Sequence, residues 1–136
     1  MSPLDDIVVG WLARADDDLR LAMLGLTARP PVHWGVAFHA QQAAEKLLKA
    51  FLTFHVIEYA KSHNIDYLLD LCEDLDKQFA TLRPAASKLT DYAVQTRCPF
   101  PTMETTEAQA REAVEIAKQV RGVVSAAMPD RFFAQR

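Results

Sequence analysis

Apolar residues recur three or four positions apart through most of this chain, and that spacing predicts helices rather than strands. Three long helices and two shorter ones, joined by short connections, predict an all-α fold. We expect an up-and-down helical bundle, formed by a single domain over residues 1–136. The predicted helices span residues 4–27, 33–58, 65–77, 84–96 and 107–127.

Helix-ending and helix-capping residues support these boundaries. Pro30 and Pro31 end the first helix, because proline lacks a backbone N–H and disfavours helical geometry in the residue before it. The segment Ser62-His63-Asn64 offers capping side chains for the third helix. Thr106-Glu107-Ala108-Gln109 matches a capping box at the start of the last helix.

Composition narrows the class of protein. Half of the residues are hydrophobic and the net charge is −3, so the chain is not disordered and has no global basic field for nucleic acid. Cys72 and Cys98 belong to no CxxC pair and have no histidine at metal spacing, which indicates reduced thiols, a cytoplasmic protein and no metal or cofactor. The acidic start and the lack of a long apolar run argue against a signal peptide and a membrane span.

Charges on the first helix have simple interpretations. Asp17 and Asp18 lie off the apolar stripe, and we expect solvent around both. Asp16 can pair with Arg20, four residues along the helix.

Four aromatic residues have structural interpretations. Trp11 and Trp34 are expected in the core or at a dimer interface. Phe132 and Phe133 are adjacent near the C-terminus, and we expect them to dock on this chain or on a partner chain.

The run from Phe38 to Lys49 is the most informative segment. On an ideal helix each residue advances by about 100°, which places Gln41 and Glu45 inside or beside the apolar sector. A buried amide or carboxylate without a partner costs roughly 2 kcal/mol or more, so the pair indicates either a polar site or an interface edge that reaches water. For Glu45 we expect a cationic partner, Arg97 or a lysine from another helix.

The other polar residues of this run share one helix face. His39, Gln42, Lys46 and Lys49 lie within about 80° of one another. Lysines one turn apart could neutralise phosphates, and they could equally form a solvated face.

Three segments together resemble a known family. They are the run at residues 38–49, Ser62-His63-Asn64-Ile65, and Tyr92-Ala93-Val94 ahead of Arg97-Cys98-Pro99. This combination is similar to the HEPN family, the higher eukaryotes and prokaryotes nucleotide-binding domain. The resemblance covers nearly the whole chain and implies an up-and-down four-helix bundle core with a short additional helix. It also implies a homodimer and a small nucleotidyltransferase partner, as in toxin–antitoxin-like systems.

The sequence departs from the family pattern in two places. Many HEPN proteins are ribonucleases that use Arg-x(4–6)-His, and no arginine here is followed by a histidine at that spacing. The family's Arg-Tyr-Pro segment is Arg97-Cys98-Pro99, so the stacking ring is absent unless Phe100 replaces it. We therefore do not predict an enzyme.

The resemblance favours a phosphate-binding role for the basic residues. We expect Lys46, Lys49 and Arg97 to converge at one end of the bundle, with His39 or His63 nearby, and to bind a nucleotide or RNA. Two alternatives remain: a ribonuclease toxin with a non-standard set such as Arg97 with either histidine, and a purely structural helical adaptor.

Overall fold

The computed structural model describes residues 2–96 and 104–133, without the side chains of residues 93–96. Its described part contains helices and no strand, so the predicted all-α fold is confirmed. The helices are α1 (Pro3–Thr27), α2 (His33–Phe54), α3 (Ile65–Leu75), the 3-10 helix η1 (Lys77–Leu82), α4 (Arg83–Thr96), α5 (Glu107–Ala126) and the 3-10 helix η3 (Asp130–Phe132).

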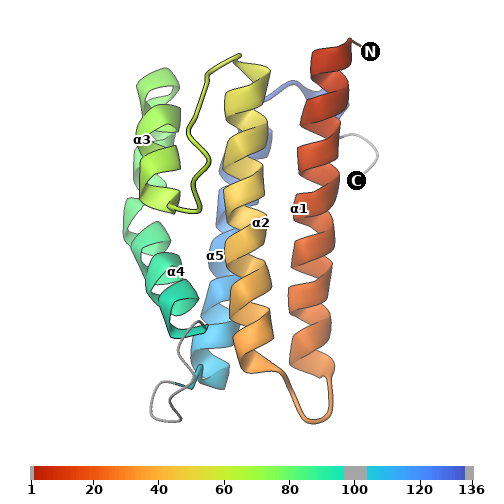
Figure 1. Ribbon diagram of the computed structural model, residues 1–136, viewed down its shortest axis with the longest axis vertical. Coiled ribbons are helices and arrows are strands. Elements are labelled where there is room, and N and C mark those ends of the chain that lie inside the picture. The colour runs from red at the N-terminus through yellow and green to blue at the C-terminus, as the bar shows by residue number, and fades with distance from the viewer. Residues whose placement is uncertain (1, 97–103, 134–136) are drawn as a thin grey trace.

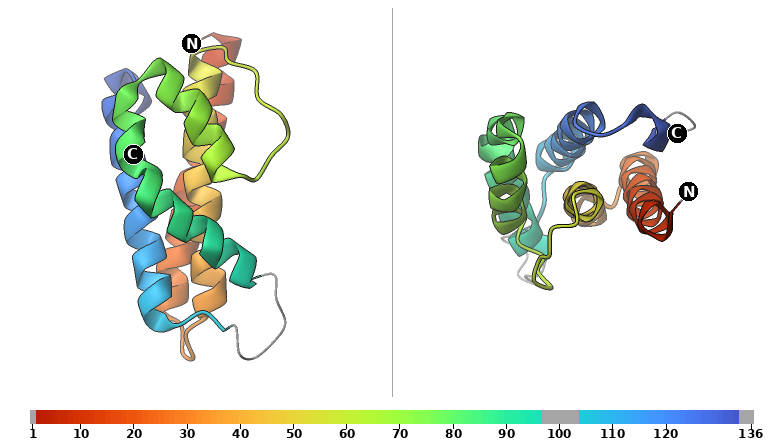
Figure 2. Two further views of the ribbon diagram at one scale, coloured as in Figure 1. Left: turned by 90° about the vertical axis from the view of Figure 1, so that its left-hand side faces the viewer. Right: turned by 90° about the horizontal axis from the view of Figure 1, so that it is seen from above.

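The helices α1, α2, α4 and α5 form the up-and-down core, and α3 is the short additional helix (Figure 1). The helix α2 packs against α1, α3, α4 and α5, and therefore lies at the centre of the molecule. Between α2 and α3, the segment of residues 55–64 runs back along the outside of α2, as both figures show (Figure 2). We call this segment the α2–α3 loop.

Capping side chains begin three of the α-helices. The Ser2 hydroxyl accepts a hydrogen bond from the Asp5 N–H at 3.1 Å, and the Asn64 side chain accepts one from the Tyr67 N–H at 3.2 Å. Thr106 and Gln109 form the predicted capping box, with each side chain bonded to the other residue's backbone N–H. These bonds satisfy donors that a helix start leaves without an intrahelical partner.

The end of α2 differs from the prediction, which extended this helix to Glu58. The helix stops at Phe54 because Val56 adopts a left-handed backbone conformation, with φ of 57°. The Val56 N–H donates to the Thr53 carbonyl and the Ile57 N–H donates to the Leu52 carbonyl. This is the Schellman arrangement, in which glycine is the usual left-handed residue. A β-branched residue gives no sequence signal for such a turn.

The third helix is also shorter than predicted, since α3 ends at Leu75 rather than Lys77. Asp76 has an extended backbone there, and its carboxylate accepts a hydrogen bond from the Gln78 N–H at 2.9 Å. The same residue therefore ends α3 and caps η1.

Small residues let α1 and α2 approach closely. Ala37, Ala40 and Ala44 of α2 are fully buried, and a Cβ added at Gly25 of α1 would lie only 2.7 Å from a methyl group of Val36. This spacing brings the polar side chains of α2 within reach of α1.

The C-terminal aromatic pair docks on this chain, one of the two outcomes expected. Phe132 is buried and meets Phe54 edge-on, with ring centroids 5.5 Å apart. Phe133 is partly buried beneath the Arg121 guanidinium. None of the described helices is long and apolar enough to cross a membrane.

Candidate functional site

A buried carboxylate of α1 binds two side chains of α2. His39 Nδ1 lies 2.8 Å from Asp18 Oδ1, and the Lys46 ammonium donates to Asp18 Oδ2. The side chains of His39 and Lys46 keep 32% and 21% of their surface exposed, whereas that of Asp18 keeps 9%. We call these three residues the Asp18 cluster; both of its basic side chains reach solvent.

A second buried carboxylate, Glu45, lies on α2 itself. Its Oε1 is 2.8 Å from His63 Nδ1 in the α2–α3 loop, and its Oε2 is 4.0 Å from the Lys49 ammonium one turn along the helix. We call these three residues the Glu45 cluster. Glu45 is thus paired with a lysine of its own helix and with a loop histidine. Of the two expected partners, a lysine of another helix is not the one found, and Arg97 lies outside the described residues.

Lys49 is held inside the molecule. Its ammonium lies 5.5 Å from the centroid of the Trp11 ring and 5.9 Å from that of the Tyr59 ring. Aromatic faces attract cations, and this attraction adds to the ion pair with Glu45. Lys49 is buried, so a ligand would have to displace these rings to reach its charge.

Side-chain amides attach the α2–α3 loop to α2. Gln41 is buried, and its side-chain amide donates to the His63 backbone carbonyl at 3.2 Å. The Gln42 side-chain amide in turn donates to Gln41 Oε1 at 3.0 Å. Gln41 and Glu45 therefore both contact His63, one through its backbone and one through its ring. This pair of contacts gives both buried polar residues a partner.

Charges in the two clusters compensate one another. Two carboxylates face two lysines, so with both histidines neutral the net charge is zero. In the Asp18 cluster both basic side chains also reach solvent, where a phosphate could approach them.

The two lysines do not lie at one end of the bundle, where we expected them to converge with Arg97. Lys46 and Lys49 lie within α2, and each faces a carboxylate. Arg97 lies outside the described residues, as does Cys98. The structure brings His39 and Lys46 to the same carboxylate, that of Asp18, and places His63 beside Glu45.

Asp18 is the residue that sequence reasoning missed, since we expected solvent around it. A signal was present: Asp18 lies three residues after Ala15 and four before Ala22, both fully buried, and so borders the apolar stripe. The predicted pairing of Asp16 with Arg20 is also wrong: Asp16 lies 3.0 Å from Arg121 of α5. Arg20 instead lies 3.8 Å from Asp17, on the surface.

Trp34 lies outside the core, with 59% of its surface exposed. Of the two places expected for it, the core is wrong and the dimer interface stays a prediction. Trp11 is partly buried against the core.

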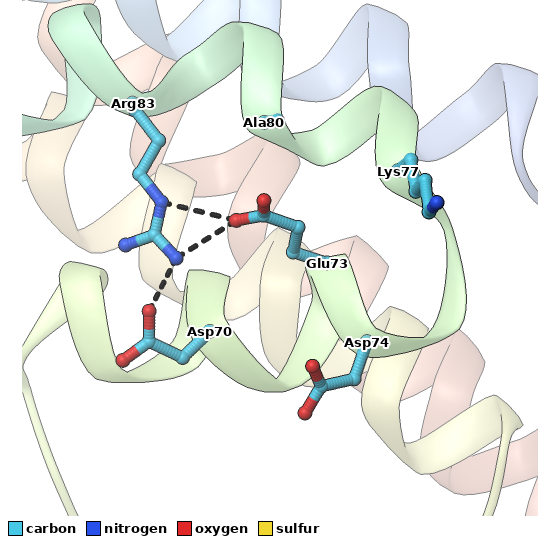
Figure 3. A pocket seen from close by; sticks show the side chains of 6 residues that line it. All are labelled: Asp70, Glu73, Asp74, Lys77, Ala80 and Arg83. Atoms are coloured by element: carbon cyan, nitrogen blue, oxygen red, sulfur yellow. Dashed lines mark hydrogen bonds and ion pairs between the residues drawn. The ribbon is translucent and has the colours of Figure 1, made fainter.

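Another polar region lines a hollow of about 610 Å³ beside α3 and η1 (Figure 3). Arg83 points to Asp70 and to Glu73, whose Oε2 is 2.9 Å from the guanidinium. The hydrogen bond to Asp70, and after it the one to Glu73, raises the pKa of Arg83. Three carboxylates and two cations line the hollow, so it is a poor site for an anion.

The tyrosine of the third family-like segment has a structural role. The Tyr92 hydroxyl donates to Glu112 of α5 at 3.2 Å, and burial raises the pKa of Tyr92. Lys88 lies 3.0 Å from the same carboxylate and holds the pKa of Glu112 below its ordinary value. These contacts join α4 to α5.

The thiol of Cys72 is buried in the core. Burial raises the pKa of Cys72 to about 12, so this thiol stays protonated and unreactive near neutral pH. Residues 2–96 and 104–133 contain no group of three histidine, cysteine or acidic side chains placed to hold a metal ion.

These features define a class: an all-α up-and-down bundle whose polar side chains gather along its central helix. The model of the HEPN domain family matches residues 8–127, and the chain therefore belongs to this family. Among solved structures, it is similar to ST0689, described as an archaeal HEPN homologue. The two chains share 24% identity with a TM-score of 0.70, over 93% of this chain and 98% of that one. This likeness shows the fold. A search of curated proteins found no match.

Proposed function

We propose that this HEPN protein is a cytoplasmic homodimer that binds the phosphate of a nucleotide or RNA at the Asp18 cluster. The observation that carries the proposal is the convergence of His39 and Lys46 on one carboxylate, with both basic side chains open to solvent. A phosphate oxygen can accept hydrogen bonds from both without disturbing the core.

The Asp18 cluster is preferred over the Glu45 cluster because of where the lysines lie. Lys46 is partly exposed, whereas Lys49 is enclosed by Trp11, Tyr59 and Glu45. Bringing a phosphate to Lys49 would require opening this packing.

The family supports a second part of the proposal, a small nucleotidyltransferase as partner in a toxin–antitoxin-like system. A nucleotidyltransferase gene beside this one, and a complex of the two proteins after co-expression, would support the pairing. Two proteins that elute separately at all mixing ratios would contradict it.

Thermal unfolding in the presence of ATP, AMP or a short RNA tests the phosphate site. A ligand that binds only the folded state raises the unfolding temperature. Lys46→Ala should abolish that rise, while Lys118→Ala, which removes a surface lysine of α5, should keep it. The rise should shrink with added salt, because salt screens the attraction between the phosphate and the basic side chains.

Wild-type protein that none of these ligands stabilises would contradict phosphate binding. An unchanged rise in Lys46→Ala would place the site elsewhere. Incubation of the purified protein with RNA separates this proposal from the ribonuclease alternative, since cleavage that His39→Ala abolishes would favour the enzyme.

A further inference from the structure

The helix α1 carries a row of exposed residues on the side that faces away from the bundle. Figure 2 shows α1 at one edge of the bundle. The row has alternating steps of three and four residues, the heptad spacing by which helices pair. Its members are Ile7, Gly10, Arg14, Asp17, Leu21 and Leu24.

Three members of this row are large apolar side chains left in water. Ile7, Leu21 and Leu24 are 55%, 49% and 61% exposed. A Cβ added at Gly10 would meet nothing within 4 Å, so the space above this residue is open. Single exposed apolar residues are ordinary, but a row at heptad spacing indicates a helix-pairing surface.

The order of residues in the row is self-complementary. If a second copy of α1 lies antiparallel, with the twofold axis level with the point between Ala15 and Asp16, Arg14 lies against the partner's Asp17. In the same register Gly10 lies against the partner's Leu21, and Ile7 against the partner's Leu24. Opposite charges meet at the centre, a large side chain meets the glycine, and apolar residues meet at both ends.

We propose that this row of α1 is the surface through which two copies of the chain pair, antiparallel and in that register. The charges select this occupant, because a twofold pairing matches each Arg14 with an Asp17 and needs no other protein. The helix has 25 residues and is therefore about 37 Å long, enough for several contact layers. The inference rests on the proposed homodimer and names its surface.

Charge reversal tests the register. Arg14→Glu places two acidic side chains together at both symmetry-related contacts, and Asp17→Arg places two basic ones together. Each should weaken the dimer about tenfold or more, measured as the dissociation constant by analytical ultracentrifugation. The double variant Arg14→Glu/Asp17→Arg restores opposite charges across the axis and should return to within about threefold of wild type.

A matched control uses the same spacing on another helix. Glu115 and Lys118 of α5 form an exposed i,i+3 ion pair, so Glu115→Lys, Lys118→Glu and their combination should leave dimerisation unchanged. Leu24→Glu should weaken the dimer as the single reversals do, while Leu75→Glu on α3 should not.

Disulfide trapping gives a second measurement of the register. In a Cys98→Ser background, Gly10→Cys/Leu21→Cys should form interchain disulfides rapidly on mild oxidation. Gly10→Cys alone should not, because the two introduced thiols would lie about 16 Å apart along the axis.

Several results would overturn the inference: a wild-type protein that is monomeric at every concentration, single reversals that leave the dissociation constant unchanged, or a folded double variant that stays weakened. Nucleotide stabilisation is a separate readout. If it persists while the reversals change nothing, the interface is wrong and phosphate binding stands. If the charge reversals break the wild-type dimer but nucleotides do not stabilise that dimer, the interface stands and phosphate binding is wrong.

Discussion

The two carboxylate clusters beside α2 use the same residue types with different results. In the Asp18 cluster the acid comes from α1, and both basic partners reach solvent from α2. In the Glu45 cluster the acid and Lys49 are both buried, and the exposed histidine comes from a loop. An ion pair whose two partners are both buried stabilises the packing, whereas one whose basic partner reaches solvent is open to a ligand. We therefore expect Glu45 to stabilise the fold and the Asp18 cluster to bind ligand.

The largest expected effect comes from removing each acid in turn. Glu45→Ala leaves the Lys49 charge buried without its carboxylate and should lower the free energy of unfolding by about 3 kcal/mol. Asp18→Ala leaves Lys46 and His39 free to turn to water and should cost about 1–2 kcal/mol. Urea unfolding at one protein concentration measures both.

Glu115→Ala, on the exposed face of α5, is the control and should change the stability by no more than about 0.5 kcal/mol. If Glu45→Ala costs no more than this control, the cluster does not stabilise the fold. If Asp18→Ala costs more than Glu45→Ala, the proposed division of roles is reversed.

The fold was predictable because it depends on local periodicity. Apolar stripes and capping residues such as Asn64 and Thr106 each act within a few residues of the chain, so sequence shows them directly. The clusters depend on contacts between distant segments. Asp18 pairs with residues 21 and 28 positions away, and Glu45 with a histidine 18 positions away. Helical angles could show that Gln41 and Glu45 point inward, but could not name their partners.

The close approach of α1 and α2 holds Asp18 against its partners, and Gly25 permits it. Gly25→Ala places a methyl group 2.7 Å from a Val36 methyl group, which a β-branched side chain cannot easily move aside. We expect a loss of about 1–2 kcal/mol in stability. Gly122→Ala, whose Cβ would meet nothing within 4 Å, should instead gain about 0.5–1 kcal/mol.

Chemical denaturation of both glycine variants separates packing from helix propensity. Equal gains would show that α1 and α2 have room for the methyl group. The two variants should also differ in ligand binding. Gly25→Ala should weaken nucleotide stabilisation more than Gly122→Ala does, because only the methyl group at Gly25 separates Asp18 from α2.

The Glu45 cluster is closed by a loop whose first turn is strained. Val56 has a φ of 57°, and a left-handed conformation costs a non-glycine residue about 1–2 kcal/mol. Val56→Gly should remove this strain but increase the entropy of the unfolded chain, for a net gain of about 0.5–1 kcal/mol. Val56→Ala retains a Cβ and should gain much less. A loss of stability in Val56→Gly would show that the exposed valine packs favourably in a way that outweighs the strain.

The smallest effect is expected from His63, although it lies 2.8 Å from Glu45. Its side chain is 68% exposed, and its carbonyl still accepts the hydrogen bond from Gln41 when the ring is removed. His63→Ala should therefore cost less than about 1 kcal/mol, because Lys49 continues to face the carboxylate. Urea unfolding of His63→Ala and of Glu45→Ala under the same conditions compares their losses in the free energy of unfolding. A loss as large as that of Glu45→Ala would mean that the histidine, and not the enclosed lysine, compensates the buried acid. The Glu45 cluster would then depend on a partner that reaches solvent, as the Asp18 cluster does.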